Sequence, residues 1–395
     1  MWPFSKAHKQ REEKRQTGAD GGLAAPFLRL GLTAFGGPAA HIAMMEEEFV
    51  RRRAWLTRGE FLDMLGATNL IPGPSSTEMA IHIGHQRAGW KGLVAGGMCF
   101  LLPAFLITIA VAWAYVRFGS LPQVQGVMYG VKPVIIAVVL HALWGLGRTA
   151  IRNGFLVAVA LAATCAALLG ANTLVVLIGA GVLTMARRWI AEQGLVVAAI
   201  PSAAGSLVAS GVVPVALAQS SLLGLFLFFV KVGAILFGSG YVLLAFLQAD
   251  LVDRLHWMTQ AQLFDAIAIG QLTPGPVSST ATFIGYLLGG TKGAIVATVG
   301  IFLPSFFFVA ASRPLIPRIR RSKIAGAFLD GVNVGAVALM AAVTWQLSRA
   351  ALVDLTTAVV AVVSALLLIF FRINSAWLIF AGGAVGLAVT RWLGG

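Results

Sequence analysis

Two similar stretches decide the fold: Asn69–Glu78, which reads NLIPGPSSTE, and Gln271–Thr280, which reads QLTPGPVSST. Each lies inside an otherwise apolar segment. Its Pro-Gly-Pro triplet is expected to interrupt a helix there, because proline removes a backbone donor and clashes with the preceding turn. Within lipid, such a break is tolerated only where protein or a water-filled cavity satisfies the freed backbone groups. Two such breaks at equivalent places are most simply those of a transporter, with its site at the breaks.

The composition places the chain in a bilayer. Apolar residues make up 58% of the 395 residues and charged residues only 11%, against about 25% charged residues in a soluble domain. Mean hydropathy is +0.86, and several nearly uncharged runs are long enough to cross a hydrocarbon core. The formal net charge of +14 is distributed between the apolar runs. We therefore interpret it as a mark of cytoplasmic loops, not of a surface that binds nucleic acid.

The sequence contains an internal duplication. Equivalent residues are separated by 202 positions before the Pro-Gly-Pro triplets and, after the loss of one residue, by 201 positions beyond them. The matched pairs include Phe35 and Phe237, Trp55 and Trp257, Asp63 and Asp265, Pro72 and Pro274, Pro103 and Pro304, and Trp144 and Trp345. Agreement over a whole half with one deletion indicates two homologous halves.

The duplication predicts an all-α polytopic membrane protein. Each half should contain two broken or re-entrant helical segments followed by four transmembrane helices, and one further span should link the halves. The expected parts are a cytoplasmic N-terminal tail (1–22), a first repeat (23–189), a linking membrane segment (190–221) and a second repeat (222–395).

The charges of equivalent loops predict that the two halves are inverted. Arg51–Arg58 is strongly basic, whereas its equivalent, Asp250–Gln260, is not. The asymmetry reverses later, because Arg313–Lys323 is basic and its equivalent around Arg117 carries a single arginine. Since basic loops stay in the cytoplasm, equivalent loops should lie on opposite sides of the inner membrane. The N-terminus is then cytoplasmic and the C-terminus periplasmic, whether the broken segments are re-entrant or full spans.

The pattern resembles the chromate transporter family in its long, two-domain form. The resemblance rests on Phe35–Pro38, Asn69–Glu78, Phe237–Gly240 and Gln271–Thr280 and covers nearly the whole chain beyond the tail. It implies export of chromate, a tetrahedral dianion similar to sulfate, by secondary transport that uses an ion gradient. We add six motif residues to the expected substrate site: Gly36, Gly37, Asn69, Gly238, Ser239 and Gln271.

The residues around the breaks fit an oxyanion independently of the resemblance. The N-terminus of a half-helix offers N–H donors and partial positive charge to an anion. The expected site therefore includes the hydroxyls of Ser75, Ser76, Thr77, Ser278, Ser279 and Thr280, and the break residues Pro72, Gly73, Pro74, Pro274, Gly275 and Pro276. These hydroxyls could instead cap their own helices, or do both.

Charged residues inside apolar segments are further candidates. Arg29 and Lys231 are equivalent positions that could attract the substrate, although each could instead reach the membrane interface or pair with an acid. Glu78 is a proton-coupling candidate, with a structural ion pair as the alternative. His41 and His82 are weaker candidates of the same kind, because membrane histidines often only form hydrogen bonds between helices. Lys132 and Asp330 are interpreted as interfacial.

Other functional classes find no support in the sequence. No His/Cys/Asp cluster has the spacing of a metal site, no nucleotide-binding loop is present, and no cofactor or enzymatic activity is expected. Cys99 and Cys165 are interpreted as small membrane-facing or packing residues. The expected partners are a chromate or sulfate-like oxyanion and the lipid bilayer, and a homodimer is compatible with the sequence. An uptake permease for sulfate or a related oxyanion and an anion channel remain alternatives.

Overall fold

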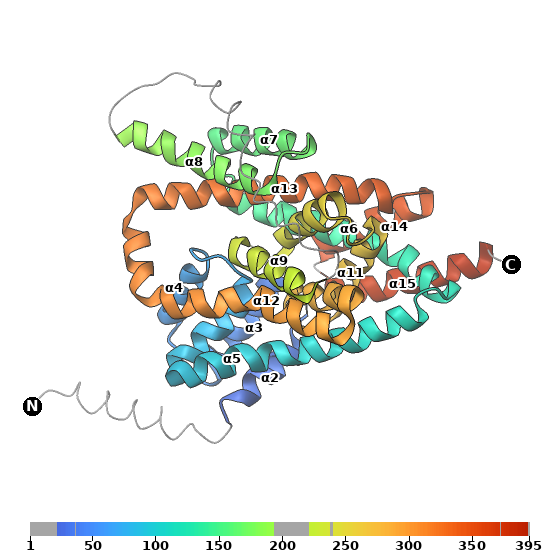
Figure 1. Ribbon diagram of the computed structural model, residues 1–395, viewed down its shortest axis with the longest axis horizontal. Coiled ribbons are helices and arrows are strands. Elements are labelled where there is room, and N and C mark those ends of the chain that lie inside the picture. Colours follow the sequence, from blue (N-terminus) through green and yellow to red (C-terminus); the bar gives the residue numbers. More distant parts are fainter. Residues whose placement is uncertain (1–21, 36, 193–220, 238–239, 372, 394–395) are drawn as a thin grey trace, which may run out of the picture.

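The computed structural model describes residues 22–35, 37–192, 221–237, 240–371 and 373–393, whose regular structure is helical (Figure 1). The first half comprises α2 (Ala24–Thr33), α3 (Gly37–Met45), η1 (Glu46–Arg52), α4 (Arg58–Thr68), α5 (Ser75–Phe118), α6 (Pro122–Ala150), α7 (Gly154–Leu168) and α8 (Thr173–Glu192). The second comprises α9 (Leu222–Ile235), η2 (Gly240–Val242), α10 (Leu243–Phe246), η3 (Leu247–Arg254), α11 (Gln260–Leu272), η4 (Val277–Ser279), α12 (Thr280–Arg321), α13 (Lys323–Ala351), α14 (Leu355–Phe371) and α15 (Ser375–Leu393). The expected tail and linking segment lie almost wholly outside the described residues.

The two halves use the same local chemistry at equivalent places. The helix that leads to each break, α4 or α11, begins with a capping box. In the first, the Thr57 hydroxyl accepts from the amide of Glu60, whose carboxylate accepts from the amide of Thr57. In the second, Thr259 and Gln262 make the same reciprocal pair. Each box satisfies amides that a helix N-terminus leaves unpaired, so both helices start at fixed positions.

The two longest helices are each bent once. Backbone angles leave the helical region at residues 88–89 in α5 and 289–290 in α12, and the second residue of each bend is a glycine with φ of 58° or 60°. The arms pack closely beyond the bend, because a Cβ added to Gly84 or Gly92 would collide with the carbonyl of the other. Each long helix is therefore two helices: the one that follows a break, and the first of the expected four spans.

Five of the described helices are long and apolar enough to cross a membrane. They are Ser75–Phe118, Pro122–Ala150, Thr173–Ala191, Val277–Ser312 and Lys323–Ala351. Helices α7, α9 and α14 are apolar but shorter, at 10–17 residues, and so fall below the roughly 20 residues that a perpendicular crossing needs. The expectation of a polytopic helical membrane protein agrees with these lengths.

The halves interlock rather than standing side by side. Helices α7 and α8 of the first half pack along α13 of the second, as Figure 1 shows at the top of the view. Reciprocally, α14 and α15 of the second half pack along α6 of the first. A single large hydrophobic core draws buried side chains from both halves, among them Phe100, Ile135, Phe229 and Leu339. Because each half completes the other, we expect them to fold as one unit.

Candidate functional site

Backbone hydrogen bonds tie each Pro-Gly-Pro break to the opposite half. The amide of Gly73 donates to the carbonyl of Leu236 over 2.6 Å, and the amide of Gly275 donates to the carbonyl of Ala34 over 2.8 Å. Donors and acceptors are equivalent pairs, since 275 − 73 and 236 − 34 both equal 202. Both glycines have positive φ, 147° and 99°, where a side chain would be strained. Each break is thus anchored to the end of the first helix in the other half.

The hydroxyls after the breaks are buried, as an anion site would require. Ser75, Ser76, Thr77, Ser278, Ser279 and Thr280 are all buried. The hydroxyl of Thr280, the first residue of α12, donates to the carbonyl of Val277 in the preceding η4, 2.7 Å away. Within the described part of the chain, the hydroxyls of Thr77, Ser278 and Ser279 have no hydrogen-bond partner. Buried polar groups normally find partners, so these three remain available to a ligand.

Glu78 lies at the first break together with a residue from the other half. Its side chain is fully buried, and neither carboxyl oxygen has a hydrogen-bond partner among the described residues. A Cβ added to Gly73 would collide with Oε1 of Glu78 and with Oγ of Ser305 in α12, so all three residues meet. At the second break the equivalent neighbour of Gly275 is Ala104. The first break is therefore the more polar one, and Ser305 is a candidate site residue that the sequence analysis missed.

The remaining motif residues differ in their surroundings. Gln271 is buried and its Nε2 has no partner within the described residues, whereas Asn69, its equivalent, is exposed. Gly37 begins α3 with a φ of 81°. Gly36, Gly238 and Ser239, which the sequence analysis also placed in the site, lie outside the described residues. Of the two polar residues that precede the breaks, Gln271 is therefore the buried one, and contact of either with substrate stays a prediction.

Arg29 lies on the exposed side of α2, at the edge of a hollow of about 470 Å³. This hollow, the first-half hollow, is lined by Arg29, Leu30, Thr33, Ala43, Met44, Glu47, Glu48 and Arg52. Glu48 is held by Arg53, with 2.7 Å between Oε1 and Nε, rather than by Arg29. Contact of Arg29 with substrate stays a prediction, and the hollow gives an anion room to approach it.

Lys231, the equivalent of Arg29, is engaged by an acid. Its Nζ donates to Oδ2 of Asp250 over 2.7 Å, and Arg254 reaches the other carboxyl oxygen at 3.3 Å. Asp250 is the equivalent of Glu48, because 250 − 48 is 202. The geometry thus favours the structural alternative considered for Lys231, pairing with an acid, and that acid is Asp250. A paired lysine has less charge to offer a substrate.

The two histidine candidates lie on different elements. His41 in α3 is buried, with its ring edge-on to Phe100 at 6.0 Å between centroids. His82 stands one helical turn after Glu78 in α5, and its Nε2 has no partner within the described residues. The location of His82 fits a proton path that includes Glu78. Neither role is tested by the geometry alone, so both stay predictions.

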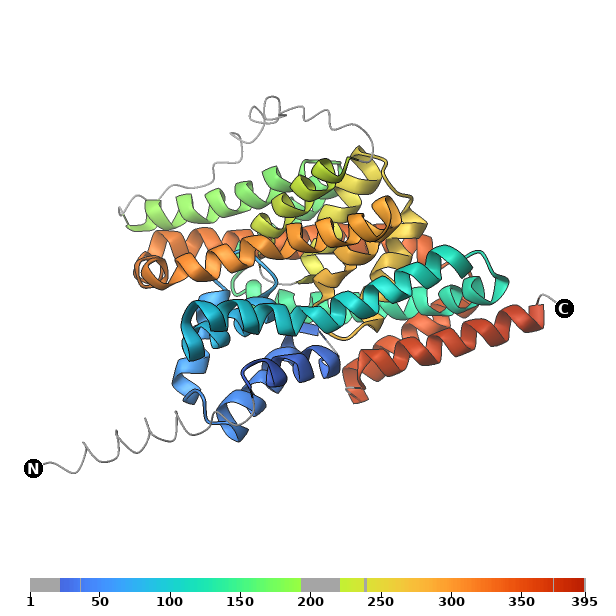
Figure 2. The ribbon, with the colours of Figure 1, turned by 60° about the horizontal axis from the view of Figure 1, so that its bottom comes forward.

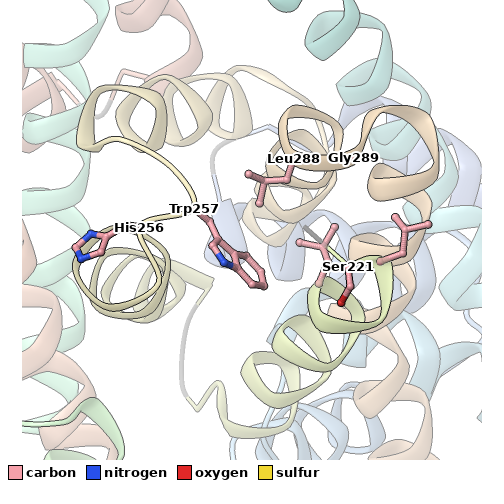
Figure 3. A pocket seen from close by; sticks show the side chains of 7 residues that line it. Ser221, His256, Trp257, Leu288 and Gly289 are labelled. Atoms are coloured by element: carbon pink, nitrogen blue, oxygen red, sulfur yellow. The ribbon is translucent and has the colours of Figure 1, made fainter. Parts of the chain in front are cut away.

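A separate small pocket lies away from the breaks (Figure 3). It measures about 150 Å³ and is lined by Ser221, Leu222, Leu225, His256, Trp257, Leu288 and Gly289. Figure 3 shows the Trp257 ring between His256 and Ser221. The pocket joins the start of α9 to the bend of α12, and no residue of either Pro-Gly-Pro triplet lines it. It is therefore not the site that the breaks build.

An ion pair between the halves also escaped the sequence analysis. Lys132 in α6, interpreted there as interfacial, lies 3.1 Å from Oδ1 of Asp265 in α11. The hydroxyl of Tyr115 in α5 donates to the other oxygen of Asp265 over 2.6 Å. We call Lys132, Asp265 and Tyr115 the α11 cluster. The sequence shows three polar residues in apolar runs, but their pairing depends on how the halves interlock.

These features define a class of protein before any comparison. Two equivalent, interlocked helical halves with buried polar groups at paired helix breaks are typical of a membrane transporter. No group of His, Cys, Asp or Glu in the described ranges could hold a metal ion. The chain is a multi-pass membrane protein of that class.

The chain belongs to the chromate transporter family. The family model, described as "Chromate transporter", matches residues 22–185 and 223–387, one match in each half. The duplication predicted from the sequence is thereby confirmed, as is the family. This is a family of transporters, not of enzymes.

Curated relatives agree with the family. A "Chromate transport protein" of Cupriavidus metallidurans is 34% identical over 368 residues, which are 91% of this chain and 90% of the relative. One of Pseudomonas aeruginosa is 33% identical over 337 residues, 83% of this chain and 80% of the relative. An "Uncharacterized transporter" of Methanocaldococcus jannaschii is 29% identical over 93% of this chain and 94% of its own length. No solved structure matches the chain.

Proposed function

We propose that this protein is a secondary active transporter that exports chromate across the inner membrane, driven by an ion gradient, with the anion bound between the two breaks. One observation carries the proposal: the hydroxyls of Thr77, Ser278 and Ser279 are buried beside half-helix N-termini without partners in the described residues. A buried donor left unpaired costs about 1–3 kcal/mol. An oxyanion recovers that cost, and the amides and dipole of each half-helix favour its charge.

Chromate is the substrate that the relatives support. Proteins named for chromate transport match this chain at 33–34% identity over at least four-fifths of both lengths. Chromate presents four oxygens and two negative charges, which suits several hydroxyl and amide donors spread over two half-helices. Sulfate has nearly the same shape and charge. An uptake permease for sulfate or a related oxyanion therefore remains the nearest alternative.

In this proposal the two halves are inverted in the membrane and exchange shapes around the central site. The reciprocal bonds of Gly73 and Gly275 fit a twofold relation between the halves. The distribution of basic loops predicts that the twofold axis lies in the membrane plane, with Arg51–Arg58 in the cytoplasm. The segments before the breaks, from α2 to α4 and from α9 to α11, are then the broken or re-entrant elements that carry substrate between the two sides.

Glu78 is the proposed site of proton coupling. Its carboxyl group is fully buried next to Ser305 at the first break. A negative carboxylate there would repel a dianion, whereas the neutral acid could donate a hydrogen bond to it. The protonation state of Glu78 would then decide whether the site accepts the anion, and would make transport depend on pH. His82, one turn further along α5, would stand on the path by which the proton arrives.

Uptake of labelled chromate into everted membrane vesicles tests this function. We expect saturable uptake that depends on an ion gradient and that Ser279→Ala reduces. Thr164→Ala is the matched control, because its hydroxyl only bonds the carbonyl of Ala160 within α7, 2.8 Å away. Uptake that does not saturate would indicate an anion channel. Uptake only into right-side-out vesicles, with sulfate preferred, would indicate the permease.

A further inference from the structure

The two broken segments are packed differently, although their sequences are equivalent. Phe264 in α11 is 2% exposed, whereas Leu62, the equivalent residue in α4, is 51% exposed. Asp265 is 8% exposed, whereas its equivalent Asp63 is exposed. Helix α11 packs against α6, α12 and α15, while α4 packs against α5, α12 and η1. In Figure 1, α11 lies in the middle of the molecule, and in Figure 2 the blue first-half segment lies at its lower edge.

The α11 cluster fastens the buried segment to the other half. Asp265 receives the charge of Lys132 on one oxygen and the hydroxyl of Tyr115 on the other, at 3.1 and 2.6 Å. The contact with Lys132 is an ion pair, and the bond from Tyr115 is a charge-assisted hydrogen bond, a kind about twice as strong as a neutral one. The cluster joins α5, α6 and α11 and so bridges both halves. The position of α11, and with it the second break, depends on this bridge.

The charged pair nearer the start of each segment shows the same difference. In the second half, the pair of Lys231 and Asp250 closes the space between α9 and η3. In the first half, Arg29 and Glu48 occupy the same two places but line the open first-half hollow of about 470 Å³. The burial of α11 and the Lys231–Asp250 pair both indicate that the second-half segment is closed. The exposure of α4 and the first-half hollow both indicate that the first-half segment is open.

We propose that this structure is one end state of the transport cycle, in which the α11 cluster closes the second-half side while the first-half side is open. In the opposite end state, α11 releases Lys132 and α4 moves inward, so that Asp63 lies against α13 at Asn333. This inference rests on the proposed function, because it requires inverted halves. When two equivalent halves exchange conformations, the protein reaches a second state with similar internal packing that opens on the other side. Under the charge assignment above, the present state is open to the cytoplasm.

The sequence makes the two states unequal. The place of Lys132 is taken in the second half by Asn333, and the place of Tyr115 by Ile316, since both pairs differ by 201. The opposite state therefore lacks both the cation and the hydroxyl that hold Asp265 in this one. Lys132, Asp265 and Tyr115 are thus positioning residues that favour the present state in the absence of substrate. Lys132→Asn, which copies the residue of the other half, should remove most of that preference.

Cross-linking of paired cysteines in native membranes tests the inference without any substrate. Cys99 and Cys165 are first replaced. The pair Lys132→Cys with Asp265→Cys, joined by a short bifunctional thiol reagent, should lock α11 in place and stop transport. The pair Asp63→Cys with Asn333→Cys should cross-link slowly, and at least about fivefold faster when Lys132→Asn is added, the lower end of ordinary coupling between sites. The control pair is Thr282→Cys with Thr298→Cys, whose hydroxyls lie 2.7 Å apart within α12. Its rate should not respond to Lys132→Asn.

The outcomes separate this inference from the proposed function. If the 63–333 pair never cross-links, and the 132–265 pair can be cross-linked without loss of transport, α11 is static and the inference is wrong. If the pairs respond as expected but no chromate is carried, the end states stand and the substrate must be another anion. If Lys132→Asn fails to fold, Tyr115→Phe takes its place, because it removes one hydroxyl only. This variant should also make the 63–333 pair cross-link faster.

Discussion

The amide nitrogen of Gly275 lies 2.8 Å from the carbonyl oxygen of Ala34, and this contact joins the second Pro-Gly-Pro break to the first helix of the other half. The φ of Gly275 is 99°, and a Cβ at this position would lie only 2.7 Å from the Cβ of Ala104. The break thus depends on a residue without a side chain. The equivalent Gly73 also has a positive φ and no space for a side chain.

Gly275→Ala is therefore expected to destabilise the protein by about 1–3 kcal/mol, the usual cost of a strained backbone position. Thermal unfolding of the detergent-solubilised protein measures the effect. Gly145→Ala in α6 is the matched control, because nothing lies within 4 Å of its Cβ position and alanine favours a helix. Equal melting temperatures for the two variants would contradict the strained geometry.

Arg29→Gln and Lys231→Gln should have different consequences, although the positions are equivalent. Loss of Arg29 removes a charge that faces the first-half hollow, so chromate affinity should fall roughly tenfold. Loss of Lys231 removes the partner of Asp250, so the melting temperature should fall while affinity is largely kept. Equilibrium binding and thermal unfolding of both variants decide this. A larger loss of affinity in Lys231→Gln than in Arg29→Gln would contradict this account and would indicate that the anion binds near Lys231.

Equivalent loops are expected on opposite sides of the membrane. Ser120 and Ser322 are both exposed at the ends of long helices, and the basic loop around Ser322 should remain in the cytoplasm. In a background without Cys99 and Cys165, Ser322→Cys should react with an impermeant thiol reagent from the cytoplasm only, and Ser120→Cys from the periplasm only. Labelling of both from one side would rule out inverted halves.

Glu78→Gln should leave the fold intact and abolish the pH dependence of transport, because glutamine has nearly the same shape but cannot carry a proton. The measurement is the rate of chromate uptake across pH in the parent and the variant. Ser305→Ala, which removes a neighbour of Glu78 but no titratable group, is the control and should keep a pH dependence. A pH profile in Glu78→Gln like that of the parent would assign Glu78 to a structural role.

Much of the fold could be predicted because the duplication repeats local signals. The offset of 201 residues predicts that α6 and α13 are equivalent helices, and both have 29 residues. Proline and glycine marked both breaks, and the glycine amides donate hydrogen bonds across the halves there. The inverted arrangement stays a prediction, which the labelling of Ser120→Cys and Ser322→Cys tests.

The contacts between the halves could not be predicted, because they depend on packing over long sequence distances. Nothing local indicates that Lys132 meets Asp265, 133 positions away, or that Ser305 reaches Gly73. The equivalence of Arg29 and Lys231 suggested equal roles, yet within the part of the chain that the structure describes only Lys231 has an acidic partner. A duplicated sequence predicts similar contacts in both halves, so a difference such as this one has to be read from the structure.

The central claim is that the paired breaks form one oxyanion site. Equilibrium binding of labelled chromate to the purified protein tests this claim most directly. The variant Thr77→Ala/Ser278→Ala/Ser279→Ala removes the three hydroxyls that lack partners among the described residues. Each should contribute about 1 kcal/mol or more, so affinity should fall about a hundredfold, while Thr164→Ala binds like the parent. A folded triple variant with the parent's affinity would contradict the account, and the site would lie away from the breaks.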